Sequence, residues 1–167
     1  MKNPAVKRIV MTALFSAAAL VSFMIENLFP PLFVPGARLG ISNVFTLLAV
    51  ICLGIKEGFA VLLVKILLGS LFSGNASAVI YSLPSGIISL TAEVALLTFT
   101  RKISVVSVST LGGSLNLTVQ NAIFCLIAGG EYLIYLPYLS AIGALSGAFV
   151  GFAVYLIVGR IPKRFTD

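Results

Sequence analysis

Residues 9–29, IVMTALFSAAALVSFMIENLF, form an apolar run that decides the class of this protein. At 1.5 Å per residue, a helix of this length spans about 30 Å, which is the thickness of the hydrocarbon core of a bilayer. Basic residues precede the run, as in a signal peptide, but the run is longer than the apolar region of such a peptide and further apolar runs follow. The sequence therefore predicts an uncleaved first transmembrane helix.

The whole chain has the composition of an integral membrane protein. Of its 167 residues 59% are hydrophobic and 10% are charged, and the mean hydropathy is +1.14, whereas a soluble domain is about 25% charged. The apolar runs predict a single all-α domain over residues 1–167, a bundle of six transmembrane helices. The predicted spans are 9–29, 40–55, 58–73, 77–100, 106–128 and 133–158. The breaks between them contain Gly, Pro or charged residues, as at Lys56-Glu57-Gly58.

The basic residues indicate how the chain is oriented. With the N-terminus in the cytoplasm, nine of the eleven Lys and Arg residues fall on the cytoplasmic side, Arg38 falls outside, and Lys65 lies within a span. This asymmetry follows the positive-inside rule and needs an even number of spans, so both termini are expected in the cytoplasm of a multi-pass protein of the cell membrane. It also explains the net charge of +6 without a nucleic-acid partner.

The loop PPLFVPGARLGISN, residues 30–43, carries the one basic residue that this asymmetry does not explain. Prolines and glycines fix turns and permit hinging, so the loop is expected to form an outward-facing lid. We expect Arg38 to stand at the mouth of a cavity beneath it.

Charged side chains inside the membrane cost about 2.5–3.5 kcal/mol each and usually serve a function. Lys65 lies about halfway along its span, so it is expected to face a protein-lined cavity or an acidic partner. Glu26 could form a structural ion pair with it, and that alternative remains open. Glu93 is nearest the cytoplasm and is expected to pair with Arg101 or Lys102, or to contact a partner.

Polar residues of other spans are expected to line the same cavity, in the outer half of the bundle. Asn116 and Gln120 are four residues apart and share one face of a helix. Amides can also serve only to join helices, and the tyrosines of the last span can serve as interface residues. The candidate solute-binding residues are Glu26, Arg38, Asn43, Lys65, Ser82, Ser85, Asn116, Gln120 and Tyr135.

Small residues at four-residue spacing mark two faces where helices can approach closely. The face formed by Gly143, Gly147 and Gly151 is expected to pack within the chain. The face formed by Ala13 and Ala17 is expected either to pack within the chain or to dock a partner.

The residues required by several kinds of catalysis are missing. The chain has no His, no phosphate-binding loop and a single Asp at its tail, and Cys52 and Cys125 lie far apart in apolar runs. We therefore expect no enzyme activity, no metal and no cofactor.

Three segments resemble the Gx transporter family, many of whose members carry the name heptaprenyl diphosphate synthase component I. They are PGARLGISNVFTLLAVICLGIKEGFAVLLVKILLGSLFSG, YSLPSGIISL and LNLTVQN, and the resemblance runs from about residue 28 to residue 120. Leu115 stands where the family pattern has His. The positions that match the family pattern are Arg38, Gly40, Asn43, Ser82, Leu83, Gly86, Asn116 and Gln120.

The order of these segments is also similar, more distantly, to the substrate-binding S components of energy-coupling factor (ECF) importers. That resemblance implies six helices that capture a small vitamin-like or anionic metabolite, with Lys65 near the ligand and the loop 30–40 as a gate. It also implies that Ala13 and Ala17 dock a coupling subunit that works with two ABC-type ATPases. The synthase name implies instead an accessory subunit that holds a prenyl-transfer enzyme of isoprenoid or quinone metabolism, and a carrier that works without ATPases is a third reading.

Overall fold

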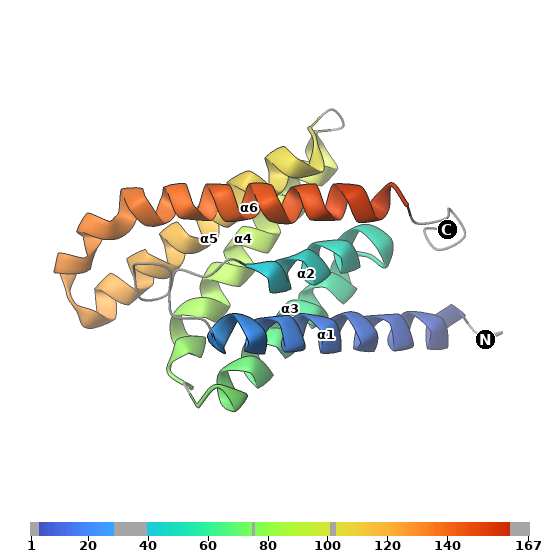
Figure 1. Cartoon of the computed structure of the whole chain (residues 1–167), viewed down its shortest axis with the longest axis horizontal. Helices are drawn as coiled ribbons and strands as arrows, with labels where there is room; N and C mark the ends of the chain where they lie inside the picture. The colour runs from blue at the N-terminus through green and yellow to red at the C-terminus, as the bar shows by residue number, and fades with distance from the viewer. Residues whose placement is uncertain (1–3, 29–39, 75, 101–102, 161–167) are drawn as a thin grey trace.

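The computed structural model describes residues 4–28, 40–74, 76–100 and 103–160. Within those ranges every secondary-structure element is a helix, as predicted (Figure 1). The elements are α1 (Pro4–Leu28), α2 (Ile41–Cys52), α3 (Ile55–Phe72), α4 (Ala78–Phe99), α5 (Val105–Ala128), the 3₁₀ helix η1 (Gly130–Tyr135) and α6 (Leu136–Val158).

Four helical segments in the described part of the chain are long and apolar enough to cross a membrane, and they belong to α1, α4, α5 and η1–α6. The helix α2 has only 12 residues, and the 18 residues of α3 include Lys56, Glu57 and Lys65. Large apolar side chains such as Leu126 and Phe149 are exposed on the outer surface. Such a surface requires a lipid environment, so the chain is a multi-pass membrane protein.

The helices form two groups that meet in the middle of the molecule. The first three pack on one another, α5 packs along α6 and on α4, and contacts of α2 with α6 and of α3 with α4 join the two groups. Figure 1 shows that α1 begins and α6 ends at the same end of the molecule. The candidate site lies where α1 finishes and α2 begins, beside α5 and α6, which extend past this point.

Glycines bring α5 and α6 into backbone contact, which confirms that this small-residue face packs within the chain. A Cβ atom on Gly151 would lie 2.7 Å from the Cα of Val106, and one on Gly147 would collide with the carbonyl of Ser109. A Cβ atom on Gly113 of α5 would likewise collide with the carbonyl of Gly143. Only glycine allows so close an approach, so this helix pair forms a rigid wall for the site.

The predicted break at Lys56-Glu57-Gly58 is wrong, because α3 already begins at Ile55. The chain turns instead at Gly54, whose φ of 129° is a conformation that side-chain-bearing residues rarely adopt. Charged residues are tolerated in the first turn of a helix, and an acidic one is favoured there by the helix dipole.

Candidate functional site

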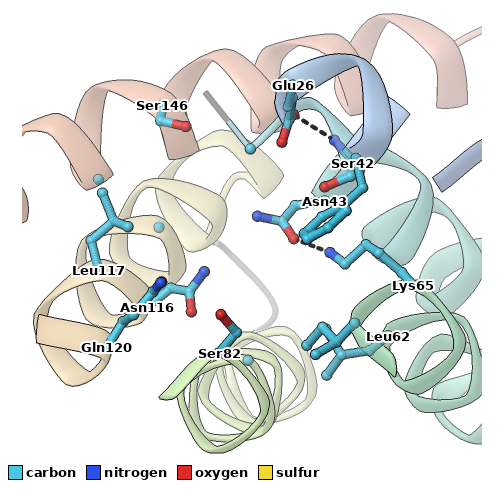
Figure 2. Close-up of a pocket in the computed structure, with 16 residues that line it drawn as sticks. Glu26, Ser42, Asn43, Leu62, Lys65, Ser82, Asn116, Leu117, Gln120 and Ser146 are labelled. Atoms are coloured by element: carbon cyan, nitrogen blue, oxygen red, sulfur yellow. Dashed lines mark hydrogen bonds between the residues drawn. The ribbon is translucent and has the colours of Figure 1, made fainter. Parts of the chain in front are cut away.

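All six helices contribute to a polar cavity of about 70 Å³ near the point where α1 finishes and α2 begins (Figure 2). The lining residues are Phe23, Glu26, Gly40, Ser42, Asn43, Leu62, Lys65, Ile66, Ser82, Gly86, Gly113, Asn116, Leu117, Gln120, Gly143 and Ser146.

Helical periodicity places the polar groups of α4 and α5 on the cavity side. Asn116 and Gln120 lie one turn apart and both line the cavity, as predicted from their spacing. Ser82 faces them from α4, and the amides of Asn43 and Asn116 lie across the cavity from each other (Figure 2). The cavity therefore presents hydrogen-bond donors and acceptors from opposite sides.

Lys65 is the cation of this cavity among the described residues. Its side chain is only 3% exposed, and its Nζ donates a hydrogen bond to Asn43 Oδ1 at 2.5 Å. Burying an ammonium group in the membrane is costly, so a position that keeps one is a candidate functional site. The predicted placement of Lys65 in a protein-lined cavity is confirmed.

Glu26 lines the same cavity and holds the start of α2. Its Oε1 accepts a hydrogen bond from the backbone N–H of Ser42 at 3.0 Å. The N-cap residue of α2 is Gly40, which has no side chain to accept such a bond, so a carboxylate from another helix does so. The negative charge also interacts favourably with the positive end of the helix dipole.

A smaller chamber of about 30 Å³ lies one helical turn deeper, toward the end of the bundle where α1 begins. The two chambers share Asn43 and Asn116 as wall residues. The residues that belong to the inner chamber alone include Thr46, Ser89, Leu90, Glu93, Ser109, Gly147 and Val150.

Glu93 lines this inner chamber, and its expected pairing with Arg101 or Lys102 stays a prediction. Arg101 and Lys102, its expected partners, lie outside the described residues, and the Glu93 side chain lies against Gly112 and lines the inner chamber. A signal was present in the sequence, because Ser82, Gly86, Ser89 and Glu93 follow the i, i+4, i+7, i+11 spacing of one helix face.

Two other candidate residues, Ser85 and Tyr135, are not part of the cavity wall. A further candidate, Arg38, lies outside the described residues, so its place at the cavity stays a prediction. Ser85 is fully buried, but its hydroxyl donates to the carbonyl of Ser82 in its own helix, and it is not part of the cavity wall as described. Tyr135 belongs to η1, where its ring is exposed and lies 6.4 Å from that of Tyr132, and it does not line the cavity as described.

A separate groove of about 570 Å³ runs between α1 and α3 on the outer surface. Ala13 and Ala17 are exposed on its α1 side, so they do not pack within the chain. At one end of the groove Arg8 donates a hydrogen bond to the carbonyl of Leu53 at 2.6 Å and lies 3.7 Å from Glu57. The groove is otherwise almost entirely apolar, with walls formed by Ile9, Leu20, Ala60, Val64 and Leu68.

Metal-binding clusters of three or more His, Cys, Asp or Glu residues do not occur in the ranges that the structure describes. Cys52 and Cys125 are both free thiols on different helices.

Comparison with protein families gives one match. The model of the family described as heptaprenyl diphosphate synthase component I matches residues 15–157, which include all six helices in whole or in large part. No curated protein and no solved structure matches the chain significantly. Because the match covers most of the sequence, the chain belongs to the heptaprenyl diphosphate synthase component I family.

Proposed function

We propose that this chain is the substrate-binding subunit of an ECF-type importer, and that it captures a compact vitamin-like or anionic metabolite from the outer face of the cell membrane. The observation that carries the proposal is the cavity itself. It is lined by all six helices and contains a buried ammonium group. Bundles that only anchor a partner have no need of such a polar interior, because each buried polar group costs free energy unless it is paired.

The chemistry of the cavity suits a small solute with an acceptor group at one end. The Lys65 ammonium group can donate to a carboxylate or carbonyl oxygen, and the amides of Asn116 and Gln120 offer both donors and acceptors. The volume of about 70 Å³ is well below the ~300–1,000 Å³ of sites for drug-sized ligands. In the conformation described, the cavity therefore has room only for a compact solute.

The proposed orientation places both termini in the cytoplasm and counts all six helices as spans, with the short α2 shielded inside the bundle. The positive-inside distribution supports it. In this orientation the cavity lies in the outer half of the membrane. Arg38, two positions before Gly40 in the sequence, belongs to the proposed gate.

The groove between α1 and α3 supports the second half of the proposal, a docking face for a coupling subunit. Ala13 and Ala17 let another helix approach closely, and the walls around them are apolar. The end of the groove that holds Arg8 and Glu57 lies toward the cytoplasm in the proposed orientation, and ATPases would act on that side. Two ABC-type ATPases are expected partners because this chain has no phosphate-binding loop of its own.

The family name favours a second candidate function, an accessory subunit of a prenyl diphosphate synthase. In that case the same groove would hold a synthase subunit, and the polar cavity would be a structural feature. The two candidates differ in whether a small polar molecule occupies the cavity.

The test is to purify the tagged chain from its native membrane in mild detergent, denature it and identify the released small molecules by mass spectrometry. The variants are Lys65→Met and, as a matched control, Lys56→Met, which removes an exposed lysine of the same helix. The proposal expects a compact polar compound from wild type and control, reduced roughly tenfold or more in Lys65→Met, since a hydrogen bond to a charged group contributes about 1.5–3 kcal/mol. Equal recovery of the compound from all three proteins would show that Lys65 does not bind it.

A further inference from the structure

The inner chamber contains more hydrogen-bond acceptors than the described chain can satisfy. Thr46 is only 3% exposed, and its Oγ1 has no hydrogen-bond partner among the described residues. The Oδ1 of Asn116 is likewise buried without a partner in the described part of the protein. Both residues line the inner chamber, and native structures rarely leave such atoms unsatisfied unless a ligand, ion or water binds them.

Glu93 adds a carboxyl group to the same chamber. No hydrogen bond joins it to another residue in the described ranges, and the described charge that acts on it is the ammonium group of Lys65. That ammonium group is already directed to Asn43 Oδ1 in the outer chamber. The inner chamber is thus rich in oxygen atoms, and no hydrogen bond in the described ranges holds its carboxyl group.

Glu93 is the acidic residue among the described residues that line the inner chamber. The carboxylate form of such a residue is costly in a membrane interior, and a cation bound beside it would remove that cost.

We propose that the inner chamber is a binding site for one compact monovalent cation, held by the Glu93 carboxylate and by the oxygens of Thr46 and Asn116. The cation is either Na⁺ or the ammonium group of an amine that enters from the outer chamber. A chamber of about 30 Å³ admits about two water-sized groups, since each needs about 10–15 Å³, so it excludes a quaternary ammonium ion such as choline. Carboxylate, hydroxyl and amide oxygens are the ligands that hard cations prefer.

The test is thermal unfolding of the purified full chain in detergent, titrated separately with sodium chloride and methylammonium chloride. Choline chloride keeps the ionic strength constant throughout. A ligand that binds only the folded state raises the unfolding midpoint as it saturates the site. We expect a saturable rise of several degrees with at least one of the two cations. A rise with sodium alone assigns the site to an inorganic ion, whereas a rise with methylammonium assigns it to an amine group.

Two variants keep the test independent of a general change in stability. Glu93→Gln should abolish the cation-dependent rise whatever its own midpoint, and the near-isosteric Thr46→Val should weaken the apparent affinity about tenfold. Glu131→Gln, at an exposed position of η1, is the control and should respond like wild type. The absence of a rise with either cation, or a rise that survives in Glu93→Gln, would overturn the proposal. Because the readout uses this chain alone and no transported solute, it would leave the proposed importer function untouched.

Discussion

The carboxylate of Glu26, near the end of α1, accepts a hydrogen bond from the backbone N–H of Ser42, in the first turn of α2, at 3.0 Å. This contact joins two helices across the segment that the sequence predicts to be the gate of the site. The start of α2, the Glu26 carboxylate and the cavity are therefore one unit, and a change at Glu26 affects both stability and the shape of the cavity.

Replacing Glu26 by Leu should destabilise the protein by about 1–2 kcal/mol, because a charged cap at a helix N-terminus is lost and buried N–H groups are left without an acceptor. Glu26→Gln keeps an acceptor but loses the charge, so its effect should be smaller. Thermal unfolding followed by circular dichroism in detergent measures both. A midpoint for Glu26→Leu equal to that of wild type would show that the contact does not hold α2.

Replacing Gly147 by Ala should cost about 1–3 kcal/mol or more, because the new methyl group collides with the backbone carbonyl of Ser109 and forces α5 and α6 apart. Gly130→Ala is the matched control, since no atom lies within 4 Å of the methyl group it would add. The comparison needs only the unfolding midpoints of the two variants. Equal midpoints would mean that the α5–α6 wall is not as tightly packed as described.

Much of this fold could be predicted from hydropathy and charge. Each predicted apolar segment covers most or all of one observed α-helix, and the four-residue spacing of Asn116 and Gln120 predicts the shared face that lines the cavity. These features depend on composition and on the 3.6-residue repeat, which are properties of the local sequence. The packing of the glycine face of α6 follows from the same kind of pattern.

Other parts of the site depend on tertiary contacts. The spacing of Glu93 from Ser82 and Ser89 puts these residues on one face of α4, but only the structure shows the inner chamber that Glu93 lines. The Ser85 hydroxyl donates a hydrogen bond within its own helix, as small polar residues often do, and Tyr135 ends a 3₁₀ helix that covers the start of the predicted last span. Thr46 was not considered because one hydroxyl in an apolar helix carries no signal by itself.

Replacing Ala17 by Leu should leave the fold intact and weaken the association with a membrane partner, because the exposed groove between α1 and α3 is filled. Ala141→Leu, at an exposed position of α6 outside this groove, adds the same side chain elsewhere and should have no such effect. The measurement is the amount of partner protein recovered with each tagged variant from native membranes, at equal recovery of the chain itself. Equal partner recovery from Ala17→Leu and Ala141→Leu would exclude the groove as the docking face.

The most direct test of the importer proposal is the composition of the complex isolated through the wild-type tagged chain from its native membrane in mild detergent. The account predicts a membrane-embedded coupling subunit together with two ABC-type ATPases, in stoichiometric amounts with this chain. Recovery of a soluble prenyl diphosphate synthase without ATPases would contradict it, and would assign to this chain the accessory role that its family name describes.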